Sequence, residues 1–468
     1  AAFAPGRPKE RGSIMAKRSY EVDMCRGPLL GKILIFAFPL MLSGILQLLF
    51  NAADLVVVGR YCGSVSVAAV GSTGAITNLI VNLFIGLSVG AGVSVAHGIG
   101  SREDGAVRET VHTAVPLAAV SGVFLTVFGV AFSEAILEAM STPEDVLPLA
   151  ALYMRIYFLG ITFNMLYNFA ASMVRAAGDT ESPLVILTAA GVLNVILNVV
   201  FVHGFGMNVD GVAWATTISE ALSAAAILYV MTRRTDACKL DLKKLHFHRK
   251  PIEKMLRIGV PAGIQSSMFS LSNVVIQSAV NGFGSIAVSG NAAVANLEGF
   301  EYVIVNSFHQ TAVNFVGQNS GAMRYDRVKK TTWLCEIYAV IFGIVTGVLM
   351  CAFAPQLLSL YITDSQEAIS IGIARMYITV LPYCLFAIQD VITGVLRGLG
   401  ASFISMLLSV LGICGIRILW IYTIFQIPQF HTQGVLYMSY PLSWVITFVI
   451  QLAAFLAVFR KLERRKKA

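Results

Sequence analysis

The segment FPLMLSGILQLLFNAADLVVVGRYCGS, residues 38–64, has a second, divergent copy in VPAGIQSSMFSLSNVVIQSAVNGFGS, residues 260–285. Aligning Pro39 with Pro261 sets a separation of 222 positions. The same separation joins Asn51 to Asn273, Arg175 to Arg397, and Gly178 to Gly400. Self-similarity in so long a register predicts two copies of one structural unit.

The chain is too apolar for a soluble domain. Of its 468 residues, 56% are hydrophobic and 13% charged, with a mean hydropathy of +0.75. Apolar runs recur from Ile33 to Phe459, each long enough to cross a hydrocarbon core of about 30 Å as a helix. We count about twelve. The sequence therefore predicts an all-α polytopic membrane protein built from two pseudo-symmetric six-helix bundles.

Basic residues mark one side of the membrane. The net charge is +8, and Lys and Arg gather at both ends and between the two copies. The positive-inside rule then places both termini in the cytoplasm, as in a bacterial inner-membrane protein. The sequence has no basic face with interleaved aromatic residues, which is the pattern that would indicate nucleic-acid binding. The expected division is a tail at 1–28, an N-lobe at 29–232, a basic linker at 233–251, a C-lobe at 252–459 and a basic tail at 460–468.

Each copy contains an even number of expected spans, so both copies enter the membrane from the same side and the repeat is parallel. Two such bundles enclose a central cleft, and rocking one against the other gives alternating access. The duplication therefore favours a transporter over a membrane enzyme. Pro39 and Pro261 lie inside the first span of each copy, where they predict a helix kink, with simple packing geometry as the alternative.

Polar residues in the first span share one helical face. Gln47, Asn51 and Asp54 are spaced i, i+4 and i+7. Asp54 is the only acid in that span, and an ionised carboxylate in a membrane is costly unless it faces a polar cavity or binds a cation. Asp54 is therefore a candidate functional residue, and the alternative places it in water at the extracellular helix end.

Further polar positions in the N-lobe converge on the same region. In the fourth span they form one stripe, and those in the fifth and sixth spans follow at helical spacing. Taken one at a time, each asparagine would be interpreted as a hydrogen-bonding contact between neighbouring helices. With a carboxylate, the set predicts a site for H⁺ or Na⁺, and a sodium ion would lie at Asp54, Asn194 and Thr216. The residues are Tyr153, Tyr157, Asn164, Asn168, Arg175, Asn194, Asn198 and Thr216.

Arg175 and its copy Arg397 lie at expected cytoplasmic helix ends. We expect the side chain to reach the membrane surface there, with a gating role as the alternative.

The C-lobe carries a different ionic set. Glu298 and Glu301 fall in the eighth span, Arg375 and Asp390 in the tenth, and Arg417 in the eleventh. Two interpretations stay open, salt bridges between helices and direct contact with substrate. The residues expected to line the substrate cleft are Asn51, Tyr153, Tyr157, Glu298, Glu301, Asp390 and Arg417.

Five motifs together resemble one known family. They are PLMLSGILQLLFNAADLVVVG, AAVGSTGAI from Ala68, VRAAGDTESP from Val174, GVAWATTIS from Gly211 and GVLRGLG from Gly394. The chain resembles the multidrug and toxic compound extrusion (MATE) transporters, and more narrowly their DinF-like and MepA-like bacterial branch. The resemblance implies two six-helix lobes in a V shape that exchange H⁺ or Na⁺ for organic cations or other amphipathic compounds.

The resemblance also implies particular residues. The family's N-lobe cation site falls on Gln47, Asp54, Asn168, Asn194 and Thr216, with Tyr153 a looser match. Asn198 departs from the pattern, because archaeal-type relatives carry Asp there and couple protons through paired carboxylates. The NorM-like C-lobe site is imperfect, since the seventh span has no acid and Asp390 is shifted by about one turn.

The expected function is a cation-coupled antiporter, active as a monomer in the lipid bilayer, with H⁺ or Na⁺ as coupling ion and no other cofactor. A flippase for a lipid-linked saccharide is the alternative, for which we expect more basic residues lining the cleft. A membrane-embedded transferase needs clustered acids or a His with an acid, but His97, His112, His203 and His309 look isolated in the sequence. Seven scattered cysteines without a CxxC pair predict reduced packing residues.

Overall fold

The computed structural model describes residues 21–140, 142–363 and 365–467, and within these ranges every regular element is a helix. Most of the expected tail at 1–28 therefore lies outside the described residues. The helices of the first copy are α1 (Leu29–Tyr61), α2 (Ser64–Ser101), α3 (Asp104–Ala139), α4 (Leu147–Ala176), α5 (Glu181–Val199) with the π-helical turn η1 (Val200–Gly204), and α6 (Val209–Thr232).

A connection with one short helical turn, η2 (Leu242–Lys244), leads to the second copy. Its long elements are α7 (Arg249–Asn281), α8 (Ser285–Gly321), α9 (Tyr325–Ala352), α11 (Gln366–Thr379), α12 (Tyr383–Gly398) and α15 (Gln433–Lys467). Shorter elements are α10 (Ala354–Ser359), α13 (Ser402–Ser409), η3 (Val410–Gly415), α14 (Ile416–Tyr422), η4 (Ile424–Gln426) and η5 (Pro428–Phe430).

Among the described residues, nine helical stretches are long and apolar enough to cross a membrane. The pair α11 and α12, bent by 48° at its break, makes a tenth. Helices α7 and α8 have 33 and 37 residues, long enough to span, but are more polar. With these two the total reaches the twelve expected, and the prediction of a polytopic all-α protein is confirmed.

The backbone repeats its unusual conformations at separations of 222 positions for one pair and 221 for another, within one residue of the sequence repeat. Gly178 and Gly400, after α4 and α12, both have left-handed φ angles, of 101° and 79°. Arg102 and Met323, after α2 and α8, share the same conformation with φ angles of 60° and 52°. Non-glycine residues rarely adopt it. Its recurrence at equivalent helix ends supports the duplication independently of side-chain identity.

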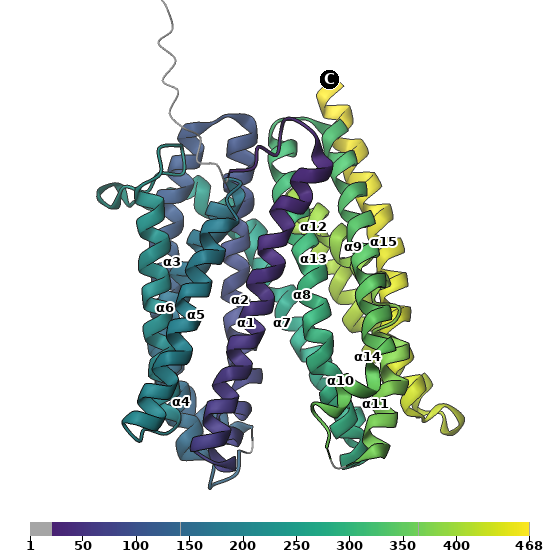
Figure 1. The fold of residues 1–468 in the computed structure, drawn as a ribbon. Helices are drawn as coiled ribbons and strands as arrows, with labels where there is room; N and C mark the ends of the chain where they lie inside the picture. Colours follow the sequence, from purple (N-terminus) through teal and green to yellow (C-terminus); the bar gives the residue numbers. More distant parts are fainter. Residues whose placement is uncertain (1–20, 141, 364, 468) are drawn as a thin grey trace, which may run out of the picture.

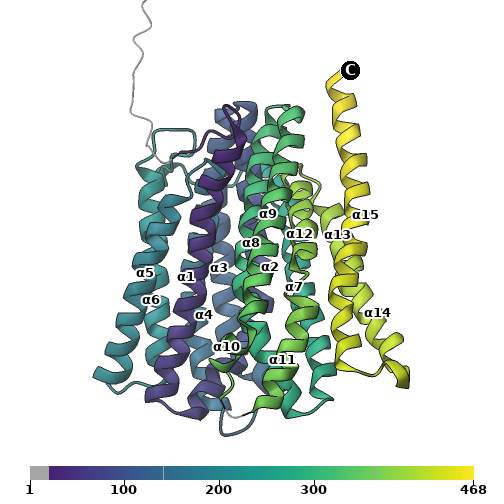
Figure 2. The ribbon, with the colours of Figure 1, turned by 45° about the vertical axis from the view of Figure 1, so that its right-hand side comes forward.

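Helices α1–α6 form one lobe and α7–α15 the other (Figure 1). The lobes lie close together at the end that carries the described chain ends, and they diverge toward the opposite end (Figure 1). We call these the closed end and the open end. Helices α14 and α15 lie at the outer edge of the C-lobe (Figure 2).

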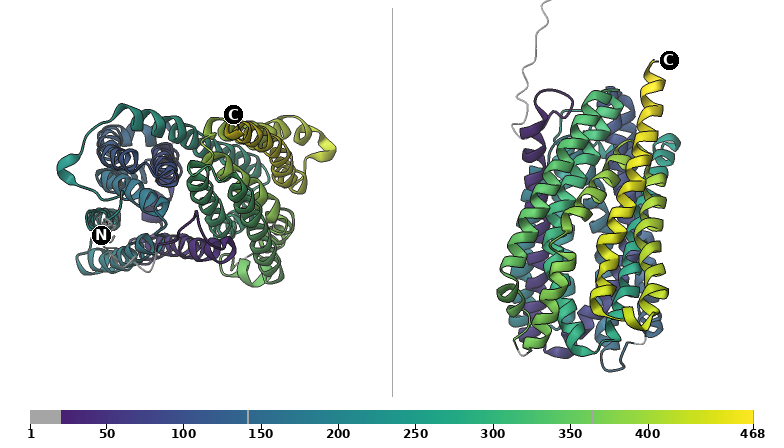
Figure 3. Two further views of the ribbon diagram at one scale, coloured as in Figure 1. Left: turned by 90° about the horizontal axis from the view of Figure 1, so that it is seen from above. Right: turned by 90° about the vertical axis from the view of Figure 1, so that its right-hand side faces the viewer.

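Helix α1 connects the two lobes. Seen from above, it lies at the edge where they meet (Figure 3). From Leu29 to Met41, its buried apolar residues join the C-lobe core, and the rings of Phe36 and Phe315 are 5.5 Å apart. Near its C-terminal end it packs against the N-lobe, with Val58 in the apolar cluster of Val202.

A segment at residues 21–27 crosses the closed end and contacts both lobes. The Val22 amide donates to the Gly178 carbonyl in the N-lobe at 3.1 Å. The Met24 carbonyl accepts from Asn319 and Arg327 in the C-lobe, each at 3.1 Å. In this conformation the segment ties the lobes together at the closed end.

Candidate functional site

A cavity of about 340 Å³ lies between the lobes. Side chains of α1, α4, α5 and α6 line it on the N-lobe side, and those of α8 on the C-lobe side. Its lining residues are Leu40, Ser43, Gly44, Gln47, Asn164, Tyr167, Asn168, Arg175, Leu187, Glu220, Ser223, Tyr302, Val303, Asn306, Ser307 and Gln310.

Glu220 is the one acid in this lining, and the sequence analysis missed it. Its Oε1 accepts a hydrogen bond from Asn164 Nδ2 at 2.7 Å. Asn164 Oδ1 in turn accepts from Asn168 Nδ2 at 2.8 Å. The sequence held a usable signal, because Glu220 lies one helical turn after Thr216 and therefore on the same face of α6.

Arg175 lines the same cavity, at the last turn of α4. The expectation that it extends to the membrane surface is wrong. No hydrogen bond or ion pair joins its guanidinium to another described residue, and its Nε is buried without a partner. The cavity thus holds one carboxylate and one guanidinium that do not pair with each other.

Asp54 forms a second cluster, outside that cavity. Its Oδ1 accepts from Asn198 Nδ2 at 2.5 Å. When the Asn194 amide nitrogen faces Asp54, it donates to the same oxygen at 2.8 Å, and the Asn194 oxygen accepts from Thr216 Oγ1 at 3.3 Å. The structure therefore brings together Asp54, Asn194, Asn198 and Thr216.

The sequence predicted that the other polar residues of the N-lobe join Asp54 in one site, but the structure places them elsewhere. Gln47 and Asn168 line the cavity and make no hydrogen bond to Asp54. Tyr153 and Tyr157 stack with ring centroids 6.4 Å apart. Asn51 is exposed on α1 and lines no part of the cavity. The predicted single set is thus two groups, one at the cavity and one at Asp54.

In the C-lobe, the structure favours the salt-bridge interpretation for Glu298. Its Oε2 lies 2.6 Å from Arg375 Nη2, and its other oxygen accepts from Thr379. Arg375 also donates to Asn291 Oδ1 at 2.7 Å and stacks over the Tyr437 ring. Both charges of the pair are therefore satisfied inside the lobe.

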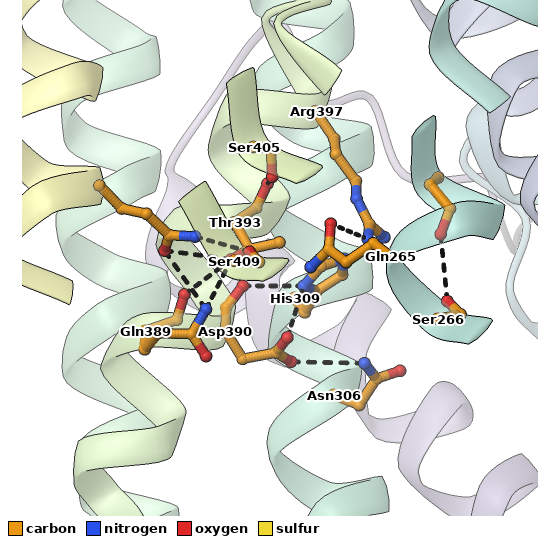
Figure 4. Close-up of polar contacts among 12 residues, drawn as sticks. Gln265, Ser266, Asn306, His309, Gln389, Asp390, Thr393, Arg397, Ser405 and Ser409 are labelled. Carbon is orange, nitrogen blue, oxygen red and sulfur yellow. Dashed lines mark hydrogen bonds and ion pairs between the residues drawn. The ribbon is translucent and has the colours of Figure 1, made fainter. Parts of the chain in front are cut away.

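Asp390 belongs to a chain of polar contacts that runs through His309 and Arg397 to Gln265 (Figure 4). His309 Nδ1 lies 3.1 Å from Asp390 Oδ1 and 2.8 Å from the Asp390 carbonyl. His309 Nε2 lies 3.3 Å from Arg397 Nη1, while Arg397 Nη2 donates to Gln265 Oε1 at 2.9 Å. Because Arg can only donate, this contact assigns the ring proton to Nδ1. His309 is therefore not isolated, contrary to the sequence-based expectation.

The other C-lobe candidates also face inward within the lobe. Glu301 accepts from Thr346 Oγ1 at 3.2 Å. Arg417 donates to Ser443 Oγ at 3.1 Å and stacks over the Tyr440 ring. None of the cavity lining comes from Glu298, Glu301, Asp390 or Arg417, so their predicted contact with a substrate in this cavity has no support in this conformation.

The described residues show no group of three His, Cys, Asp or Glu side chains that could hold a metal ion. The cysteines are all free thiols, and four of the seven are buried. At Asp54 the structure instead gathers one carboxylate, two amides that donate to it and one hydroxyl, a set in which the carboxylate is the group that can bind H⁺ or Na⁺.

Comparison with protein families gives a match to the family model described as MatE, over residues 39–200 and 261–423. The two matched blocks begin at the two duplicated prolines. The probable multidrug resistance protein YoeA of Bacillus subtilis is 28% identical over 434 residues, which cover 91% of this chain and 93% of the relative. An FAD transporter of Shewanella oneidensis is 26% identical, covering 83% of this chain and 86% of the relative.

Solved structures share the fold. A MOP superfamily transporter from Pyrococcus furiosus, described as having a binding pocket of reverse polarity, superposes with a TM-score of 0.89 at 19% identity, over 96% of this chain and 99% of that one. An outward-facing multidrug resistance MATE transporter gives a TM-score of 0.86 at 21% identity, over 97% and 100% of the two chains.

Proposed function

The chain belongs to the MATE family of membrane transporters, and from this premise we propose that it exports amphipathic organic cations in exchange for a cation that binds at Asp54. Members of this family are transporters and not enzymes. The observation that carries the proposal is the pairing of an intramembrane carboxylate with two asparagine amides, beside a separate cavity between the lobes.

The geometry at Asp54 favours H⁺ as the coupling ion. Both amides present N–H groups to Oδ1 of Asp54 and thereby stabilise its ionised form. The carboxylate can accept a proton without any movement of these neighbours. Sodium would need oxygen ligands, so the amides of Asn194 and Asn198 would have to turn their oxygens toward the ion.

Helix α1 supplies a route from cation binding to lobe movement. Protonation of Asp54 removes its charge and weakens both hydrogen bonds to α5, because bonds to a charged acceptor are roughly twice as strong as neutral ones. The C-terminal part of α1 that carries Asp54 is then held less firmly by the N-lobe, while its residues from Leu29 to Met41 stay in the C-lobe core. We propose that this change biases the lobes between two packings.

The cavity supplies a binding place for an organic cation. Glu220 provides the negative charge, and Tyr167 and Tyr302 provide aromatic surface. Burial of one carboxylate among polar and aromatic groups is typical of sites that bind amphipathic cations. Relatives named as multidrug resistance proteins agree with this assignment.

The test is ethidium efflux from proteoliposomes under an imposed proton gradient or an imposed sodium gradient. We expect efflux with the proton gradient, and loss of the gradient-driven component in Asp54→Asn. The matched control is Glu134→Gln, because Glu134 pairs with Arg155 on the exposed surface. Full gradient-driven efflux by Asp54→Asn would contradict the proposal, and efflux driven by sodium alone would reassign the coupling ion.

The flippase alternative gains no support from the cavity. A lipid-linked pyrophosphate calls for several basic residues, and among the described residues Arg175 is the only one in the lining.

We also propose a monomer in the bacterial plasma membrane with both termini in the cytoplasm. The support for the orientation is the clustering of basic residues at both ends of the chain and between the two copies. A fluorescent protein fused after the last residue should fluoresce if that end is cytoplasmic, and a dark but membrane-inserted fusion would reverse the orientation.

A further inference from the structure

The two copies carry arginine at equivalent positions, yet only one of the two guanidinium groups has hydrogen-bond partners among the described residues. Arg397 donates to Gln265, contacts His309, and through His309 reaches the carboxylate of Asp390. Arg175 makes no such contact with any described residue.

The repeat shows which partners are missing. At the separation of 222 positions, Gln265 corresponds to Ser43 and Asp390 corresponds to Asn168. Gly63 and Gly284, which share a positive φ angle, are 221 positions apart. At this separation His309 corresponds to Ser88. The N-lobe therefore keeps the arginine but replaces the carboxylate with a neutral amide, and the long amide with a short hydroxyl.

The unpaired guanidinium faces the cavity. Ser43, Asn168 and Arg175 all line it, so the C-lobe counterpart of a closed polar cluster is open to a ligand here. Glu220 lines the same cavity and forms its hydrogen bond with Asn164, and no ion pair joins it to Arg175. A charge in a membrane interior without a counter-ion is unfavourable, and a bound anion would remove that cost.

We propose that Arg175 binds an oxyanion of the transported molecule, a carboxylate or a phosphate. The guanidinium presents a planar fork of N–H donors that matches either group. Together with Glu220, this defines the substrate class as an amphipathic zwitterion, with its anionic group toward the closed end and its cationic group deeper in the cavity. This inference rests on the proposed export function and names its substrate.

The test uses two pairs of probes that differ only in the oxyanion. Rhodamine B carries a carboxylate that its ethyl ester lacks, and riboflavin 5′-phosphate carries a phosphate that riboflavin lacks. Binding of each probe to the full chain in detergent is measured by fluorescence polarisation. We expect the charged member of at least one pair to bind about tenfold more tightly or better, as one charge-assisted hydrogen bond would give. The pair that responds identifies the oxyanion.

Variants assign the preference to Arg175. Arg175→Gln should lower the affinity for the charged member to that of its neutral analogue, and Arg175→Lys should keep part of the difference. Glu220→Gln should weaken both rhodamines alike, because both carry the delocalised cation. Glu134→Gln, on the exposed surface, is the control.

Equal binding within both pairs by the unaltered protein, including no binding at all, overturns the inference. A preference that survives Arg175→Gln overturns it as well. Since binding in detergent needs no gradient, these outcomes are independent of the ion-coupled export tested with Asp54→Asn.

Discussion

Gln318, in C-lobe helix α8, donates from its Nε2 to the backbone carbonyl of Ala176, the last residue of N-lobe helix α4, at 2.7 Å. The bond is buried at the closed end and joins the two lobes directly. Beside it, the Cys25 thiol lies 3.8 Å from the Gln318 side-chain oxygen. Cys25 can therefore report whether the closed end opens.

Gln318→Ala should make the closed end open more often. Loss of the amide leaves a buried carbonyl without a donor, at a cost of about 1–3 kcal/mol to this conformation. A shift of 1–2 kcal/mol changes an opening equilibrium by roughly 5–30-fold. We expect maleimide labelling of Cys25, followed by mass spectrometry of its peptide, to speed up by that factor.

The pH dependence of the same labelling provides a control. Burial raises the pKa of the Cys25 thiol above its ordinary value, and the thiolate is the reactive form. Labelling of the unaltered protein should therefore rise with pH beyond the range where an exposed cysteine reaches its maximum. Opening exposes the thiol and lowers its pKa, so the gain from Gln318→Ala should be largest near neutral pH. An unchanged rate at every pH would show that this bond does not hold the lobes together.

Gly86→Ala should push the lobes apart where α2 packs against α7. A methyl group at Gly86 of α2 would overlap the backbone of Gly263 in α7, and backbone cannot move aside as a side chain can. We expect a lower unfolding temperature in detergent, since overpacking typically costs about 1–3 kcal/mol. Gly74→Ala is the matched control on the same helix, because nothing lies within 4 Å of its added carbon. Equal stability of the two variants would contradict this account of the contact.

The sequence predicted the duplication from spacing alone, whereas it predicted the group around Asp54 from helical spacing together with the family resemblance. Asn194 and Asn198 are one turn apart, so whichever face carries one carries the other. Gln47 was assigned to the same site, yet seven residues along a helix correspond to about 10 Å, which places it at the cavity instead.

The different surroundings of Arg175 and Arg397 could not be predicted from the sequence motifs, which are alike around both. The difference comes from Gln265, His309 and Asp390, which lie on other turns or other helices and meet Arg397 only in the folded lobe. Chain proximity alone does not show these contacts.

Arg375→Gln should destabilise the C-lobe strongly. The side chains of Arg375 and Glu298 are 3% and 16% exposed and lie 2.6 Å apart. Removing one charge leaves the other unpaired, at a cost of about 3–5 kcal/mol, whereas replacing both with apolar groups is often neutral. The double variant Arg375→Met with Glu298→Leu should therefore unfold at a higher temperature than Arg375→Gln. A double variant less stable than the single one would show that the pair contributes more than mutual neutralisation.

Glu336 and Glu298 should respond in opposite ways to the same chemical change. Glu336, in α9, is buried, and neither of its carboxylate oxygens has a hydrogen-bond partner among the described residues. Glutamine has nearly the same shape and no charge, so Glu336→Gln removes no contact and cannot leave an ion buried alone. Its unfolding temperature should equal or exceed that of the unaltered protein.

Glu298→Gln makes the identical substitution where the carboxylate is paired, and it should lower the unfolding temperature by leaving Arg375 without its counter-ion. Measuring both variants in one detergent removes differences in purification from the comparison. Because Glu336 does not line the cavity between the lobes, gradient-driven ethidium efflux should persist in Glu336→Gln. A marked loss of stability in Glu336→Gln would show that its carboxyl group makes an interaction that the amide cannot replace.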